Sequence, residues 1–345
     1  MARRALLAGM LVVAAVGITG SAASRGNREA QRGDAAPLIL LVANQIDHTL
    51  VLVDPVERKA VGSVTVGVNG HEVVAAADGR FAYVPIYGNS GVGKPGTDGR
   101  SIDVINLRTQ KLESSIDLGN AVRPHCAKFG PDGMLYVTAE LAKAIYVIDP
   151  ATRKVIGEIP TRQAESHMFV FSPDGKKIYT SNVGSGSVSV LDVVQRKWIA
   201  TIPVARQIQR ISISTDGRRV FTQDRETPRI AVIDTATNKL DSWIAVPELA
   251  FTSAATSDGK WLLATQDAGK LLAIDLSTGK ISKTFEIPAT TGEILIAGDM
   301  AYMSCLPAGV ISVLNIRDWK MTAPITLTKG VDGLAVAAKL DSDGK

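Results

Sequence analysis

The stretch Asp149-Pro-Ala-Thr-Arg-Lys154 decides the fold, because its pattern of an Asp or Asn, four residues and then a Lys occurs seven times along the chain. The copies run from Asp54 to Lys59, Asn106 to Lys111, Asp149 to Lys154, Asp192 to Lys197, Asp234 to Lys239, Asp275 to Lys280 and Asn315 to Lys320. Each copy lies between two apolar runs of β-forming residues, as a turn inside a β-hairpin does. Seven hairpins about 42 residues apart, with four short strands in each unit, predict the blades of a β-propeller, since a blade buries its faces only against its neighbours.

A second recurring turn aligns the first strand of each blade. Asp-Gly pairs, which supply the positive φ of a tight turn, occur at Asp78-Gly79, Asp132-Gly133, Asp174-Gly175, Asp216-Gly217 and Asp258-Gly259. The residues before these pairs predict inner strands at 73–76, 127–130, 169–172, 211–214 and 252–255, and 294–297 is a shortened sixth copy.

The two ends of the repeat predict how the ring closes. Strands at 38–43, 49–53 and 61–66 lack an inner strand before them, and Gly333-Leu-Ala-Val-Ala-Ala338 matches the missing strand. We therefore expect an all-β, seven-bladed propeller over residues 38–340, with four-stranded antiparallel blades and the last blade formed by both termini, which leaves no open edge.

The N-terminus has the pattern of an export signal. Arg3 and Arg4 precede an apolar run from Ala5 to about Ile18, and small residues follow to Ser24. This pattern predicts a cleavable signal peptide at 1–24 and a flexible leader at 25–37, and hence a periplasmic or secreted protein with no membrane span after cleavage. A retained membrane anchor is the alternative.

Composition limits the other classes of function. The formal charge of +4 is only mildly basic, and the Lys and Arg residues are spread over the hairpin turns, so no nucleic-acid partner is expected. Cys126 and Cys305 fall in blades two and six, too far apart for a disulfide, and are expected to be small buried side chains. We expect a monomer whose partner is a small molecule or another exported protein.

Several segments carry a resemblance to a known family. Tyr136-Val-Thr-Ala139, Tyr179-Thr-Ser-Asn182 and Phe169-Val-Phe-Ser-Pro-Asp-Gly175 resemble the repeats of YVTN-type propellers. That superfamily includes surface-layer-like proteins, lactonase-like enzymes and the domain that holds haem d1 in a bacterial nitrite reductase. The resemblance thus implies the fold and leaves the function open.

The repeat register also places candidate site residues at one rim of the central channel. The position seven residues before each Asp-Gly pair is occupied by His71, His125, His167, Gln209 and Phe251, and the series continues with Glu293 and Asp332. Three of the four histidines thus lie in adjacent blades, and blade seven adds Asp332 beside blade one. His48, the fourth histidine, falls in a turn and is expected at the surface.

Converging imidazoles and a carboxylate are suited to a divalent transition metal such as Zn, Cu or Fe. The predicted metal ligands are His71, His125, His167, Glu293 and Asp332, and an open coordination position would admit water or a small substrate. Carotenoid oxygenases and peptide-amidating lyases resemble this arrangement, because they too hold metal with histidines from several blades. The alternative is that the position favours His for hydrogen bonds at a loop-to-strand junction.

Other residues near the rim could contact a ligand. Arg123, Gln209 and Arg210 are the candidates for ligand or cofactor binding, and Arg206 could also attract an anion. A haem d1-like ligand, to which His125 and His167 would correspond, is a less favoured alternative, and no Cys-x-x-Cys-His is present for a covalent c-type haem. The insertion at 87–101 should emerge on the same face, either as a cover or as an ordinary surface loop.

Two classes of function therefore remain open. One is a metal-dependent enzyme, acting as a hydrolase, lyase or oxidoreductase at the channel mouth. The other is an exported binding or scaffold propeller without catalysis.

Overall fold

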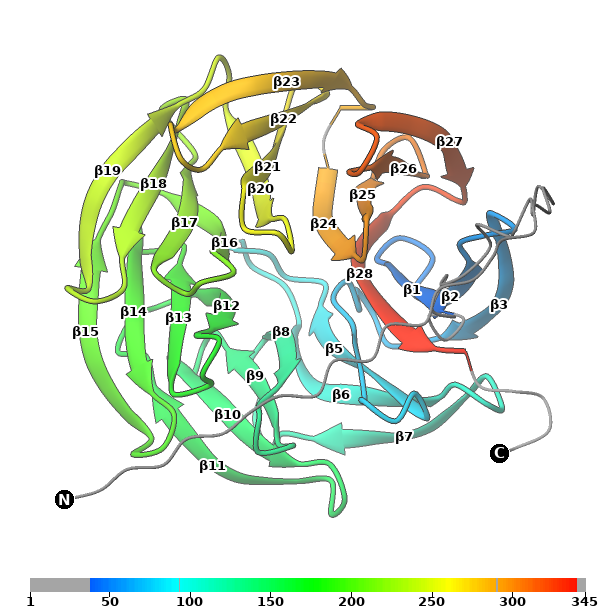
Figure 1. The fold of residues 1–345 in the computed structure, drawn as a ribbon. Coiled ribbons are helices and arrows are strands. Elements are labelled where there is room, and N and C mark those ends of the chain that lie inside the picture. Colours follow the sequence, from blue (N-terminus) through cyan, green and yellow to red (C-terminus); the bar gives the residue numbers. More distant parts are fainter. Residues whose placement is uncertain (1–37, 93, 290, 340–345) are drawn as a thin grey trace, which may run out of the picture. The chain divides into compact units, whose positions relative to one another are not determined.

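The computed structural model describes residues 38–92, 94–289 and 291–339. They form 28 strands in seven four-stranded antiparallel sheets arranged as a ring of blades, and no described residue is helical (Figure 1). The all-β, seven-bladed propeller predicted from the repeat is confirmed. The predicted signal peptide and leader, at 1–24 and 25–37, lie outside the described residues. Within the described ranges, no helix could cross a membrane.

Each blade runs from an inner strand at the channel to an outer strand at the circumference. Blades one and two contain β4 (Val74–Ala75), β5 (Phe81–Gly88), β6 (Asp98–Asn106), β7 (Lys111–Asp117), β8 (Pro124–Phe129), β9 (Leu135–Ala139), β10 (Ala144–Asp149) and β11 (Lys154–Pro160). Blades three and four contain β12 (Ser166–Phe171), β13 (Lys177–Asn182), β14 (Ser187–Asp192), β15 (Lys197–Pro203), β16 (Ile208–Ile213), β17 (Arg219–Asp224), β18 (Arg229–Asp234) and β19 (Lys239–Ala245). Blades five and six contain β20 (Ala250–Ala255), β21 (Trp261–Gln266), β22 (Lys270–Asp275), β23 (Lys280–Glu286), β24 (Thr291–Ala297), β25 (Met300–Cys305), β26 (Val310–Asn315) and β27 (Lys320–Thr326). Blade seven contains β28 (Val331–Ala338), β1 (Leu38–Asn44), β2 (Thr49–Asp54) and β3 (Lys59–Thr65).

The recurring Asp-to-Lys pattern forms the turn between the third and fourth strands of every blade. In blade two, Asp149 pairs with Lys154, and the Asp149 carboxylate accepts the backbone N–H of Ala151 at 2.9 Å. The residue just before the Lys has a positive φ in all seven turns, as at Arg153 with 58°. The short Asp or Asn side chain thus closes the turn locally, so the pattern can repeat independently of the core.

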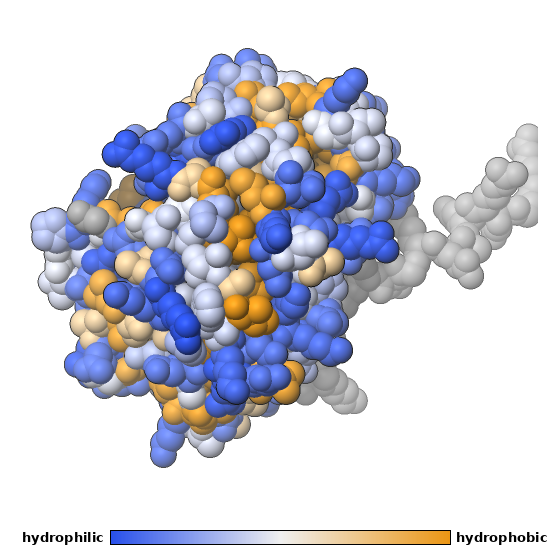
Figure 2. Space-filling view, turned by 90° about the vertical axis from the view of Figure 1, so that its left-hand side faces the viewer, coloured by the Kyte–Doolittle hydropathy of each residue, from blue (hydrophilic) through white to orange (hydrophobic). Residues whose placement is uncertain are grey.

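The apolar core lies between neighbouring blades. Tyr136 of blade two packs with Phe169 and Tyr179 of blade three, and all three are almost completely buried. The outer strands are exposed or half-buried along most of their length, and most of them have one buried residue near the end, such as Ile159 and Ile202. They leave some apolar side chains exposed, such as Ile156 and Ile199. On the side of the molecule shown in Figure 2, hydrophobic residues are interspersed with hydrophilic ones.

Both termini contribute to blade seven, as predicted. Strand β28 pairs antiparallel with β1, with Leu40 opposite Val336, and the two strands lie side by side in Figure 1. The ring is therefore closed by hydrogen bonds between the two ends of the propeller, with Leu38 opposite Ala338. Cys126 in β8 and Cys305 in β25 are buried and unpaired.

Candidate functional site

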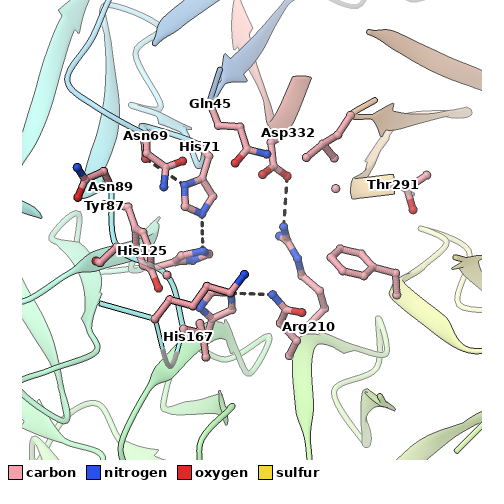
Figure 3. Close-up of a pocket in the computed structure, with 18 of the residues that line it drawn as sticks. Gln45, Asn69, His71, Tyr87, Asn89, His125, His167, Arg210, Thr291 and Asp332 are labelled. Carbon is pink, nitrogen blue, oxygen red and sulfur yellow. Dashed lines mark hydrogen bonds and ion pairs between the residues drawn. The ribbon is translucent and has the colours of Figure 1, made fainter. Parts of the chain in front are cut away.

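A cavity of about 550 Å³ opens at one mouth of the channel, where the chain enters the inner strands. The side chains around it include His71, His125, His167, Gln209, Arg210, Phe251, Thr291, Asp332, Gln45 and Tyr87 (Figure 3). The three histidines come from blades one, two and three and lie along one wall, as the repeat register predicts. Asp332 and the candidate ligand-binding residues Gln209 and Arg210 line the same cavity.

The chain enters the three histidine blades through the same local conformation. Asn69, Arg123 and Glu165 each stand two residues before a histidine and have φ values of 57°, 53° and 55°. A left-handed residue at this point turns the chain into the inner strand. The equivalent positions therefore project equivalent side chains towards the channel.

The three imidazoles are in direct contact. Nε2 of His71 lies 2.7 Å from Nε2 of His125. The rings of His125 and His167 pack against each other at a tilt, with centroids 3.6 Å apart and planes inclined by 36°. His125 and His167 are only 2% and 3% exposed, so these nitrogens have little access to water other than through the cavity.

Hydrogen bonds on the far side of two rings fix which nitrogen carries the proton. Nδ1 of His71 donates to the carbonyl oxygen of Asn69 at 3.0 Å, and Nδ1 of His167 donates to Oε1 of Glu140 at 2.5 Å. Both rings consequently present an unprotonated Nε2, which is the form of imidazole that ligates metals. Nε2 of His125 then donates to His71, and its buried Nδ1 has no hydrogen-bond partner among the described residues.

His125 is held in its neutral form. Burial lowers the pKa of His125 well below the ordinary histidine value, and the neighbouring His167, His71 and Arg210 lower it further. A neutral imidazole at physiological pH can bind a cation without first losing a proton.

A buried acidic residue behind the histidines was not found by sequence reasoning. Glu140 follows β9 directly and is 1% exposed; its Oε2 accepts a hydrogen bond from the Tyr87 hydroxyl at 2.9 Å, while Oε1 binds His167. Burial and the Glu140 carboxylate raise the pKa of Tyr87, so Tyr87 remains a donor. One sequence feature could have pointed to Glu140. It is a carboxylate directly after the apolar strand β9, at the position where blade three has Val183 after β13.

Arg123 does not occupy the position expected for a ligand-binding residue. It is 7% exposed and lies behind Tyr87, with its guanidinium 5.6 Å from the centre of the Tyr87 ring. Its Nη2 lies 2.8 Å from Asp98, and Nη1 lies 3.7 Å from Glu140. Arg123 therefore supports the histidine wall from behind and is not one of the residues around the cavity. Arg206 is exposed and paired with Glu226.

Arg210 crosses the channel opposite the histidines. Its Nη1 donates to Oε1 of Glu72 at 2.8 Å, and its Nη2 lies 3.4 Å from Asp332 (Figure 3 shows the second contact). Burial raises the pKa of Asp332, although Arg210 opposes this shift. Arg210 is thus largely committed to two carboxylates, and only its Nε lacks a partner within the described part of the chain.

The structure corrects the position expected for Glu293. In blade six Thr291 pairs with Cys305, and in blade five the equivalent pair is Ala250 with Gln266. Gly292 is therefore the blade-six equivalent of Phe251, and Glu293 lies one residue beyond the cavity position. A Cβ at this position would lie 2.1 Å from Oδ1 of Asp332, so any larger residue would displace the Asp332 carboxylate.

Glu293 instead faces a second cavity farther along the channel. This space of about 250 Å³ is also lined by Lys128 and Arg210. Oε2 of Glu293 accepts the backbone N–H of Leu334 at 2.7 Å. Burial, followed by the charge of Glu72, raises the pKa of Glu293 to about 7.

His48 lies in a turn, as expected, but it is only partly exposed. Its Nδ1 accepts the backbone N–H of Asn69 at 3.1 Å, so it supports the turn that carries His71. It is not among the residues that line the cavity.

The insertion after Tyr87 lies over the same cavity. Asn89, Ser90, Lys94 and Pro95 line its mouth, in agreement with the predicted face. Ser90 donates to Oδ1 of Asp98 at 2.5 Å, which ties the beginning of the insertion to its end.

The histidines do not stand at metal-ligating distances from one another. In the described ranges, no group of three or more His, Cys, Asp or Glu side chains has the spacing of a formed metal site. Two imidazole nitrogens on one tetrahedral metal lie about 3.3 Å apart, given metal–nitrogen bonds of about 2.0–2.1 Å, whereas those of His71 and His125 are separated by 2.7 Å.

No protein-family model and no curated protein matches the chain. Solved structures do match it. A Kuenenia stuttgartiensis hydrazine synthase is 18% identical, with a TM-score of 0.61 over 76% of this chain and 88% of that chain. A functionally unknown protein from Desulfotomaculum acetoxidans is 12% identical, with a TM-score of 0.71 over 87% and 98% of the two chains. The dihydro-heme d1 dehydrogenase NirN, in complex with DHE, is 16% identical, with a TM-score of 0.62 over 88% and 76%. Likeness at these identities shows the fold alone, so the resemblance to YVTN-repeat propellers extends to the fold and not to a family.

Proposed function

We propose that this propeller binds a divalent transition metal through Nε2 of His71, His125 and His167 and presents it to a small ligand in the channel-mouth cavity. The observation that carries the proposal is the orientation of His71 and His167. Each has its Nδ1–H committed to a fixed acceptor, the Asn69 carbonyl or the Glu140 carboxylate, so that Nε2 of each ring is unprotonated. This is the arrangement that protein metal sites use to orient histidine ligands.

Within the described residues, two ring nitrogens of the three histidines lack a good hydrogen-bond partner: Nδ1 of His125 and Nε2 of His167. The Nε2 of His167 has only a 3.4 Å contact with the Gln209 side-chain amide. A metal ion would occupy the unprotonated Nε2 of His71 and His167, and that of His125 once its proton has moved from Nε2 to the unpartnered Nδ1. Imidazole ligands favour Zn, Cu, Fe and Ni, and an ion held by three of them can polarise a bound water or substrate oxygen.

The cavity suits a small, partly polar ligand. Phe251 and Leu306 provide apolar walls, while Gln45, Gln209 and Asp332 offer hydrogen-bonding groups. Asp332 is only 5% exposed and lines the same space as the histidines, so it can join the metal as a fourth ligand or accept a proton from a molecule bound there.

Metal content is the direct test. Protein purified without a chelator should contain about one transition-metal ion per chain, and the metal-free protein should regain one site on titration with Zn²⁺ or Co²⁺. The triple variant His71→Ala, His125→Ala, His167→Ala should lose the site. His48→Gln is the matched control, because it changes the remaining histidine but retains an acceptor for Asn69. Equal metal content in the triple variant and the wild type would contradict the proposal and favour a scaffold function without metal.

A tetrapyrrole is the second candidate ligand. It is favoured by the likeness to NirN, which was solved with DHE, and by two adjacent rim histidines in this chain. Visible absorption separates the two candidates, since a bound tetrapyrrole gives an intense band that a Zn site lacks.

Export belongs to the same proposal. Arg3, Arg4 and the apolar run after them support a cleaved signal, which would place the site in the periplasm or outside the cell. The mature protein should begin near residue 24 and sediment as a monomer; an intact Met1 on protein recovered from cells would contradict cleavage.

A further inference from the structure

Glu140 joins two parts of the molecule that are separate in sequence. It lies at the rim end of blade two, and both of its carboxylate oxygens are used. Oε1 accepts from His167 of blade three at 2.5 Å, and Oε2 accepts from Tyr87, at the start of the insertion in blade one, at 2.9 Å. A single buried carboxylate therefore contacts both the third histidine and the base of the insertion.

The insertion is held to Glu140 by a second route through Arg123. Nε and Nη2 of Arg123 donate to Oδ1 of Asp98 at 3.0 and 2.8 Å, and Arg123 N donates to the carbonyl of Gly99 at 3.0 Å. Nη1 of the same guanidinium lies 3.7 Å from Glu140. The ring of Tyr87 meets His71 and His125 edge-on, with centroids 5.1 and 5.2 Å away. The insertion and the histidine wall thus share one buried, charged support.

We propose that Glu140 is a positioning residue for both structures, so that metal binding at the histidines and the anchoring of the 87–101 insertion stabilise each other. This inference rests on the proposed metal site. A metal on Nε2 makes the His167 Nδ1–H a stronger donor, which strengthens its bond to Glu140. Because Tyr87 and Arg123 hold the same carboxylate, the metal also favours the anchored insertion. Linkage requires the converse, that anchoring raises metal affinity by the same factor.

The negative charge of Glu140 is what fixes the proton on His167. A carboxylate can only accept, so His167 must donate from Nδ1 and keep Nε2 free. Glutamine at this position could turn its amide N–H₂ towards His167, which would move the imidazole proton to Nε2 and remove the lone pair that binds metal. Glu140→Gln therefore tests charge and tautomer with almost no change in volume.

Metal affinity is the first readout. Glu140→Gln should bind Zn²⁺ about 10–100-fold more weakly than the wild type, as is usual when the outer partner of a metal-bound histidine is removed. The matched control is Asp267→Asn. Asp267 follows β21 in blade five as Glu140 follows β9, and it pairs with Arg225 at 2.9 Å, away from the histidines. Its variant should bind Zn²⁺ as the wild type does.

Amide hydrogen exchange in residues 89–97 is the second readout, and a merely structural role for Glu140 would not change it in this way. Zn²⁺ should slow exchange in this segment of the wild type by about 10-fold, a typical coupling between sites. The same ion should give no such protection in Glu140→Gln. Tyr87→Phe, which removes one hydroxyl, guards against misfolding of the first variant and should also lose part of the protection.

The outcomes separate the two proposals. If the wild type binds no metal, the metal site is refuted and the coupling with it. If wild type and Glu140→Gln bind Zn²⁺ equally well, or if Zn²⁺ leaves exchange in the insertion of the wild type unchanged, the coupling alone is refuted. Weaker binding together with lost protection in Glu140→Gln, and neither effect in Asp267→Asn, would establish it.

Discussion

Arg210 of blade four donates a 2.8 Å hydrogen bond across the channel to Glu72 of blade one, and both residues are only 5% exposed. The same guanidinium lies 3.4 Å from Asp332 of blade seven. Three blades that are far apart in sequence therefore meet at one buried charge beside the histidine wall.

Replacing Arg210 should destabilise the protein strongly. Arg210→Met leaves Glu72 and Asp332 buried without their counter-charge, which we expect to lower the free energy of unfolding by about 3–5 kcal/mol. Denaturant unfolding at neutral pH measures this change. Adding Glu72→Gln should recover part of the loss, because it removes one uncompensated charge; a single Arg210→Met variant as stable as the wild type would show that the bridge has no structural role.

Glu293 should make stability fall as the pH rises. Its pKa is raised from 4.5 to about 7 in the folded protein, so the folded state keeps a proton that the unfolded chain has lost. The contribution of Glu293 to stability is therefore full below about pH 4.5 and declines until about pH 7, by an amount on the order of 2–3 kcal/mol. Glu293→Gln removes this dependence but keeps an oxygen for the Leu334 N–H. The stability difference between variant and wild type should grow in favour of the variant from pH 4.5 to 7, and a constant difference would contradict the raised pKa.

The closing strand should stabilise the entire ring. Deleting residues 331–345 removes β28 and exposes the edge of β1, including Leu40 and Val42, which are fully buried. We expect the midpoint of thermal unfolding to fall by more than about 10 °C or the domain to become insoluble, since a shift of this size needs only a few kcal/mol in a domain of this length. Deleting only residues 340–345 is the control and should leave the midpoint unchanged.

Metal affinity should fall as the pH is lowered. Protons and metal compete for the same imidazole nitrogens, and ordinary histidines take up a proton near pH 6.5. His125, with its lowered pKa, should resist protonation longest. Zn²⁺ affinity measured in competition with a chelator of known pH dependence should therefore drop by about 10-fold or more from pH 7 to pH 5. An affinity that stays constant over this range would exclude the histidines as ligands.

The sequence by itself determined the repeat architecture. Each Asp-to-Lys turn is closed by its own short side chain and by a left-handed residue such as Arg153, so hairpin boundaries could be found without knowledge of the core. Equal spacing then implied equivalent blades, and equivalence placed His71, His125 and His167 at one rim. The unpaired strands at the N-terminus and the spare strand at the C-terminus implied the closure of the ring.

The tertiary structure alone decided what surrounds the histidines. The spacing of 42 residues selected Glu293, but the turn between β21 and β22 of blade five is one residue shorter than its counterpart in blade four, which shifts the register and brings Gly292 to the cavity. The repeat does not predict the roles of Glu140, Glu72 and Arg123. Each of these side chains takes its position from a charged or hydrogen-bonding partner in another blade. Glu72 and Arg210 are 138 residues apart. Local turn chemistry can be derived from neighbouring residues, whereas a buried charge is fixed by whichever side chains the closed ring brings within hydrogen-bond distance.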